Sequence, residues 1–173
     1  LFNIGLHGPD ILFYYKPLRK NKVNRLGNKI HDESGRKFFV HAAKVLHTHD
    51  QYEEYLAYVY GVICHFALDE TCHGYVEQAV KEIGLAHIAV EGELDRELMI
   101  INGVDPVRRR MTEHIVPSMK NAVIIKDFYR GITAKEVKKA LNGMVFYDRI
   151  LVCPSKIKRM ALYAALKVAG LYY

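Results

Sequence analysis

Histidines and carboxylates recur at four-residue intervals in the middle of the chain. His65, Asp69 and His73 follow one another at this spacing, and His87 and Glu91 repeat it. On an α-helix, residues four apart lie on one face, so their side chains reach a common point. Both groups lie in apolar segments, where an unpaired carboxylate is costly. Imidazole nitrogens and carboxylate oxygens at this spacing can hold zinc, so the pattern indicates metal ligands on helices.

Spacing alone leaves a second interpretation open. One histidine–carboxylate pair on a helix usually makes a side-chain hydrogen bond or an ion pair. Two such pairs close together, with His73 between them, favour metal binding without deciding the matter.

Four sequence blocks together resemble the zinc-dependent phospholipase C family. The blocks are Leu6-His-Gly-Pro-Asp-Ile-Leu-Phe-Tyr-Tyr15, Gly27-Asn-Lys-Ile-His31, Gly61-Val-Ile-Cys-His-Phe-Ala-Leu-Asp-Glu-Thr-Cys-His-Gly-Tyr75 and His87-Ile-Ala-Val-Glu91. Their order and spacing agree with the family pattern over about residues 1–100. The ligand layout is also similar to that of the fungal single-strand-specific zinc nucleases, which share this fold.

The resemblance implies a zinc cluster of two or three ions. The first ion would have four ligands: Asp10, His31, His65 and Asp69. The second would have three: His73, His87 and Glu91. Asp69 would bridge to a third ion, whose other family ligands, an N-terminal group and an early histidine, do not occur in this sequence. His7 is a substitute to consider, although a loop histidine is more often simply exposed.

Closely spaced zinc ions suit the hydrolysis of phosphate esters. We therefore expect a phosphodiester hydrolase of the phospholipase C type, in which a metal-bridged hydroxide is the nucleophile. Asp10 would orient that group or accept its proton, in addition to binding zinc. A phospholipid is the first-choice substrate, and a zinc nuclease or small phosphoesterase is the alternative. A zinc-stabilised helical module without catalysis is an alternative of another class, because the third site is incomplete.

Helical periodicity dominates the sequence and predicts an all-α fold. We expect one multi-helix bundle over residues 1–173, preceded by a segment that is missing before Leu1. Helices are expected after Ser34, over Gln51–Leu68 with a continuation over Tyr75–Ile83, over Ala86–Ile101, from Asp105-Pro106 and including His114, from Thr133 with Glu136 as a capping box, and over Ser155–Val168. Loops are expected over Gly5–Pro17 and Asn21–Asn28. The segment Ala122–Ile125 is compatible with a strand or with a helical turn.

Composition bounds the partners and the location. The net charge of +6 suits anionic partners such as phosphoesters, acidic lipid or nucleic acid, and transient membrane contact is compatible with it. The runs Lys16–Lys22 and Arg108–Arg110 are interpreted as solvated faces. Three cysteines without a disulfide-like spacing indicate free thiols and a cytoplasmic location, although an export signal could have preceded Leu1. The oligomeric state is left open.

Overall fold

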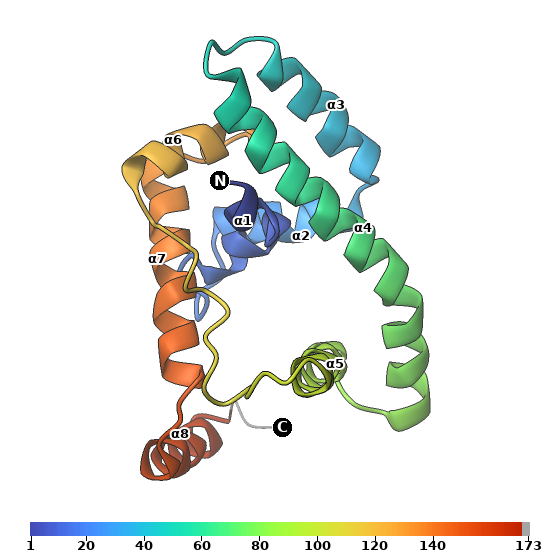
Figure 1. Cartoon of the computed structure of the whole chain (residues 1–173), viewed down its shortest axis with the longest axis vertical. Helices are drawn as coiled ribbons and strands as arrows, with labels where there is room; N and C mark the ends of the chain where they lie inside the picture. The colour runs from blue at the N-terminus through green and yellow to red at the C-terminus, as the bar shows by residue number, and fades with distance from the viewer. Residues whose placement is uncertain (171–173) are drawn as a thin grey trace. The chain divides into compact units, whose positions relative to one another are not determined.

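The computed structural model describes residues 1–170, and every regular element among them is a helix (Figure 1), which confirms the predicted all-α class. In the first half of the chain the elements are α1 (Phe2–Gly5), the 3₁₀ helix η1 (Gly8–Tyr14), α2 (Lys22–Asp32), α3 (Gly35–Leu46) and α4 (Tyr52–Ile83). In the second half they are α5 (His87–Ile101), α6 (Met119–Asp127), α7 (Ala134–Leu151) and α8 (Lys156–Val168). No described helix combines the length and the apolar character needed to cross a membrane.

The helices form two compact units. The first unit comprises residues Leu1–Gly74 and His114–Val145, and the second comprises residues 75–113 and 146–170. Helices α4 and α7 contribute residues to both units. The expectation of a single domain over residues 1–173 stays a prediction.

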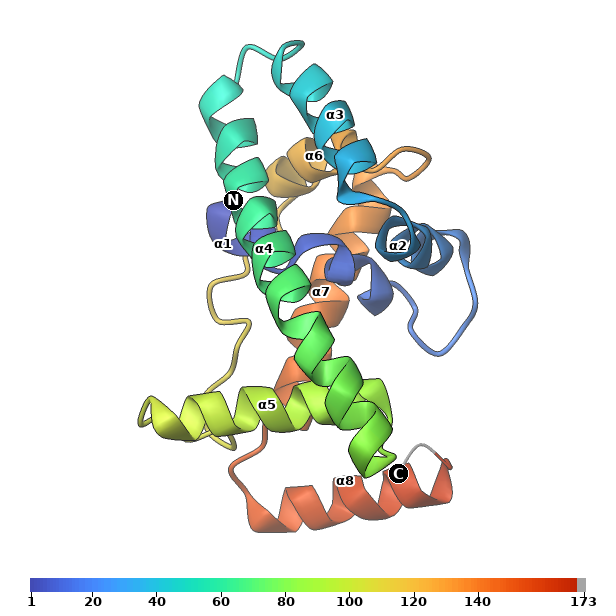
Figure 2. The same cartoon turned by 90° about the vertical axis from the view of Figure 1, so that its right-hand side faces the viewer.

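In the first unit, α1 and α4 meet backbone to backbone. A Cβ atom added to Gly61 would lie 2.2 Å from the carbonyl oxygen of Phe2, and one added to Gly5 would lie 2.3 Å from that of Tyr58. Glycine at both positions therefore permits a separation that any side chain would prevent. Figure 2 shows α1 beside α4. Because η1 follows α1 directly, this contact also holds η1 close to His65 on α4.

A buried pair of tyrosine hydroxyls joins α4 to the segment after α6. The hydroxyls of Tyr58 and Tyr129 lie 2.8 Å apart, and both side chains are almost fully buried. Burial raises the pKa of both phenols, so they stay neutral and share one hydrogen bond. Helices α3 and α4 lie side by side in both views (Figures 1 and 2). The rings of Phe39 on α3 and Phe66 on α4 pack edge to face.

Two expected loops contain helices. The loop predicted for Asn21–Asn28 is wrong, because the side-chain oxygen of Asn21 accepts hydrogen bonds from the backbone N–H groups of Val23 and Asn24 and starts α2 there. Burial of Val23 and Gly27 on one face then stabilises this polar helix against the core. The loop predicted for Gly5–Pro17 likewise contains η1.

Helix α4 passes through the predicted break at His73-Gly74 without interruption. A glycine inside a helix costs about 1 kcal/mol relative to alanine, and a helix of this length tolerates that cost. The prediction of a break is therefore wrong. Because α4 is continuous, His65, Asp69 and His73 stand on three successive turns of one helix.

The helix predicted from Asp105-Pro106 does not form. Residues 104–117 run through turns instead, and His114 lies in one of them. The carboxylate of Asp105 accepts a hydrogen bond from the N–H of Val107 and pairs with Arg108, so the capping side chain closes a local turn. Residues 105–111 bury no apolar side chain, so a helix there would gain too little stability from packing.

The remaining caps and helices agree with the sequence. The hydroxyl of Ser34 accepts a hydrogen bond from the N–H of Arg36 at the start of α3, and Ser155 caps α8 in the same way. Thr133 and Glu136 form the predicted capping box at the start of α7. The segment Ala122–Ile125 is helical and forms the middle of α6.

Candidate metal centre

Asp10, His31 and His65 converge in the first unit. Each offers one ligand atom, and these three atoms all lie within 4.8 Å of one another. The side chains come from η1, α2 and α4, elements that are far apart in the sequence. Tertiary packing therefore gathers a carboxylate and two imidazoles from separate segments at one point.

Gly8 is the residue that allows η1 to lie against His65. Its φ angle is +49°, a conformation that L residues with side chains rarely adopt. A Cβ atom at this position would lie 2.2 Å from Cδ2 of the His65 ring. The ring therefore rests on the glycine backbone, and Pro9 and Asp10 follow directly from that contact.

His31 is fixed at both ring nitrogens. Its Nδ1 donates a hydrogen bond to the carbonyl oxygen of Gly27 at 2.8 Å, and its Nε2 lies 2.9 Å from Oδ1 of Asp10. Because a carbonyl and a carboxylate both accept, the ring carries a proton on each nitrogen in this arrangement.

These contacts raise the pKa of His31 to about 9, chiefly through the hydrogen bond with Asp10; burial opposes the shift, and the bond to Gly27 supports it. The bond from Nδ1 also directs Nε2 toward Asp10, which is the orientation that a metal ligand needs.

Two of the three residues, His31 and His65, line a pocket of about 750 Å³ in the same unit. His31, His65, Asp69 and His73 line it, so all four predicted ligands from α2 and α4 face one hollow. Asp69 lies near enough for its charge to raise the pKa of His31, but outside the group of three convergent ligand atoms. Nδ1 of His73 lies 3.8 Å from Oδ1 of Asp69. Asp69 and His73 therefore line the pocket without belonging to the convergent group of Asp10, His31 and His65.

The other residues that line the pocket are mainly apolar or acidic, and the sequence did not predict that they would meet there. The apolar part of the wall comes from Ile30, Phe38, Phe39, Val62 and Phe66. Glu33 and Glu70 add carboxylates, and no lysine or arginine is among the residues that line this pocket. An anionic, partly apolar hollow of this kind suits a cation and the apolar part of a substrate.

In the second unit, His87 and Glu91 meet as their spacing predicts. Nε2 of His87 lies 2.9 Å from Oε1 of Glu91 on α5, and both side chains are more than a third exposed. The pair can present a nitrogen and an oxygen to one ion. Its assignment to a second zinc together with His73 stays a prediction.

His7 and His114 are in contact in the first unit. Their separation along the sequence does not predict this contact. The Nε2 atoms of His7 and His114 are 2.9 Å apart, although the residues are separated by 107 positions. The rings are almost parallel, with centroids 5.1 Å apart. No periodic pattern links such distant residues, so only the fold brings them together.

The convergent ligand set fits zinc by its chemistry. Two imidazoles and a carboxylate are ligands that zinc takes in catalytic sites, where a further position stays open. The hydrogen bond between His31 and the Gly27 carbonyl supplies the outer-sphere contact that such a histidine normally has. The residues present therefore meet the requirements of the ion that the sequence predicts.

Comparison with protein families assigns the chain to a family. The family model described as zinc dependent phospholipase C matches residues 1–142. The chain therefore belongs to the zinc-dependent phospholipase C family, which confirms the resemblance and extends it beyond residue 100. Comparisons with curated proteins and with solved structures gave no match. Membership of this family implies a zinc-dependent hydrolase with a phosphoester or phospholipid substrate.

Proposed function

We propose that this protein hydrolyses phosphodiesters with zinc bound at Asp10, His31, His65 and Asp69, and that a phospholipid is the substrate. The observation that carries the proposal is the convergence of one ligand atom each from Asp10, His31 and His65 within 4.8 Å. Asp69 is the fourth ligand of this proposed set because it stands one helical turn after His65 and faces the same pocket.

Each residue of the proposed centre has a distinct task. His31, held by the Gly27 carbonyl, presents Nε2 after losing the proton on that nitrogen. His65 presents its ring from the glycine-backed position on α4. Asp10 would hold zinc with its carboxylate, orient the attacking water and accept the proton that this water loses.

Bound zinc would lower the pKa of water and neutralise charge on the phosphoryl oxygens. The apolar wall made by Phe38, Phe39 and Phe66 suits the hydrocarbon part of a lipid and reduces the access of bulk water. This wall is the feature that favours a phospholipid over a small phosphoester.

A second zinc is proposed at His73, His87 and Glu91. The support is the family resemblance together with the contact between His87 and Glu91 on α5. His73 faces the pocket that the first ligand set borders. The number of ions per chain follows from elemental analysis of protein purified without added metal.

Zinc content and hydrolysis test the proposal together. We expect wild-type protein to contain two or three zinc ions per chain and to hydrolyse phosphatidylcholine faster than single-stranded DNA or a chromogenic phosphodiester. His65→Ala should lose at least one zinc and about 1,000-fold or more of the activity, because it removes a ligand of the proposed catalytic ion.

His47→Ala is the matched control, since His47 is an exposed histidine at the end of α3 and does not line the pocket. It should keep both zinc and activity. Zinc-loaded wild type without hydrolysis of any of the three substrates would instead support a zinc-stabilised helical module. Faster cleavage of DNA than of lipid would support a nuclease.

We also propose a cytoplasmic location. Cys64, Cys72 and Cys153 are all free thiols in the structure, as expected for a protein in a reducing compartment. Fractionation of the source cells tests this, and recovery outside the cytoplasm would refute it.

A further inference from the structure

A second hollow adjoins the pocket in the first unit. It has a volume of about 900 Å³ and is walled by α2, α3 and the segment Phe128–Arg130. Both hollows share four lining residues: Ile30, Glu33, Ser34 and Phe38. A ligand lying along this hollow therefore reaches the rim of the pocket that the proposed metal centre borders.

The charge of this hollow is opposite to that of the pocket. Its lining includes five lysine or arginine residues: Lys29, Arg36, Lys37, Lys44 and Arg130. Glu33 is its one carboxylate and pairs with Lys37 at 3.2 Å. Five positive charges and one negative leave a formal net charge of +4. We call this hollow the basic groove.

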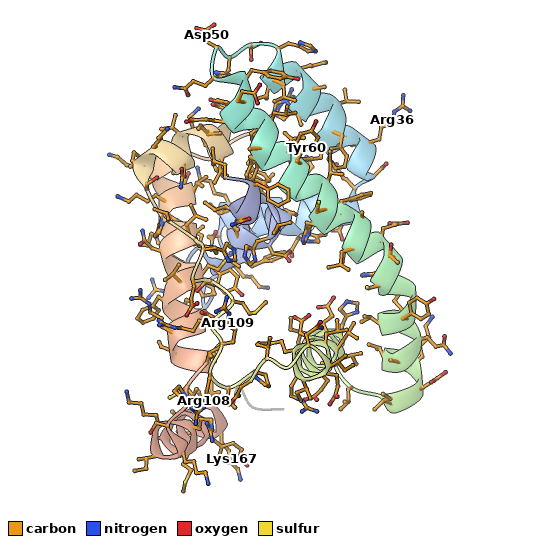
Figure 3. All side chains as sticks on the ribbon, in the orientation of Figure 1. Arg36, Asp50, Tyr60, Arg108, Arg109 and Lys167 are labelled. Carbon is orange, nitrogen blue, oxygen red and sulfur yellow. The ribbon has the colours of Figure 1, made fainter. Side chains whose placement is uncertain are left out.

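One face of α3 combines charge with exposed apolar surface. Arg36, Val40 and Lys44 are spaced by four residues and line the basic groove together. Arg36 extends away from the α3 ribbon (Figure 3), and Val40 is 49% exposed. A stripe in which cations flank an apolar side chain is typical of helices that lie on a bilayer surface.

The aromatic residues of the groove are engaged in packing. Phe128 and Tyr129 are only 2% and 1% exposed. Phe38 packs against Phe39 and Tyr129, with ring centroids 5.4 and 5.8 Å away. A groove for single-stranded nucleic acid needs exposed rings on which bases stack, and these rings are not free to serve. The groove therefore fits a lipid surface better than a nucleic acid.

We propose that the basic groove docks this protein on bilayers that contain anionic phospholipids, so that a lipid headgroup enters the adjoining pocket. This inference rests on the proposed function for its purpose, but the groove and its charge are separate observations. Electrostatic attraction to acidic headgroups supplies the affinity, and the exposed Val40 inserts at the headgroup level.

Vesicle flotation of the zinc-loaded protein tests the docking surface. Vesicles of phosphatidylcholine alone are compared with vesicles that contain about one third phosphatidylserine. A variant combining Lys29→Gln, Arg36→Gln and Lys44→Gln should lose about 100-fold in partitioning onto the anionic vesicles, since each cation contributes about fivefold. Wild-type binding should weaken as salt is added.

The control variant removes the same number of charges elsewhere in the first unit. It combines Arg19→Gln, Lys20→Gln and Lys135→Gln, which are exposed residues that do not line the groove. Its partitioning should stay within about threefold of wild type. Zinc content and circular dichroism of both variants check that the fold is intact.

Several results would overturn the inference. These are equal losses in the two variants, no preference of wild type for anionic vesicles, or a groove variant that loses oligonucleotide binding while keeping vesicle binding. Hydrolysis of a soluble phosphodiester separates this inference from the proposed function. Wild type that cleaves the soluble diester without binding vesicles refutes docking alone. Wild type that binds vesicles through the groove and cleaves nothing refutes hydrolysis alone.

Discussion

Gly8→Ala tests whether the glycine backbone supports the proposed metal centre. The new methyl group would lie 2.2 Å from Cδ2 of His65, and the φ angle of +49° is unfavourable for alanine. The backbone conformation costs about 1–2 kcal/mol. The overlap with the ring costs a further 1–3 kcal/mol or so, because His65 or η1 must move. We therefore expect a loss of about 2–5 kcal/mol in the free energy of unfolding of the metal-free protein.

Gly131→Ala is the matched control. Gly131 lies in the same unit with a φ angle of +85°, but a Cβ atom there would meet nothing within 4 Å. It should therefore lose only the backbone term of about 1–2 kcal/mol. The difference between the two variants measures the contact with His65.

Zinc affinity gives the decisive readout. Displacing the His65 ring should weaken zinc binding by about 10- to 100-fold, as for other supporting contacts of metal ligands. Competition with a chromophoric zinc chelator measures this affinity, and urea denaturation measures stability. Gly8→Ala that matches Gly131→Ala in stability and wild type in zinc affinity would refute the placement of His65 against η1.

Three further predictions concern protonation, capping and helix contact. Because the pKa of His31 is about 9 in the fold and 6.5 in the unfolded chain, its stabilisation of the metal-free protein is full below pH 6.5 and is lost as pH rises through 9. Urea denaturation in a chelator should show the advantage of wild type over His31→Gln shrinking across this range; an advantage that grows with pH would contradict the assignment. Thr133→Ala should cost about 1 kcal/mol of unfolding free energy, because it removes the capping box with Glu136, and an unchanged denaturation midpoint would count against that cap. Gly61→Ala should cost about 1–3 kcal/mol and lower zinc affinity, since its Cβ would press on the carbonyl of Phe2 and move η1; thermal unfolding without an effect would contradict the close contact.

The helical fold was largely predictable because its signals are local. Ser34, Thr133 and Ser155 cap helices through their own side chains, and each cap forms where the sequence indicates. The errors also have local causes. Gly74 lies inside a continuous helix and does not break it, and Asp105 closes a turn instead of capping a helix.

The sequence by itself determined which candidate metal ligands share a helix. Four-residue spacing places His65, Asp69 and His73 on one helix face, and it brings His87 to within 2.9 Å of Glu91. These relations depend only on helix geometry, which every α-helix shares.

Only the tertiary structure decided which segments meet. Asp10, His31 and His65 converge because η1 is held against α4 by glycine contacts and because α2 forms where a loop was expected. The contact of His7 with His114 and the basic groove between α2 and α3 likewise join residues without any common period. Such contacts follow from the packing of side chains in the core, and no spacing along the chain encodes them.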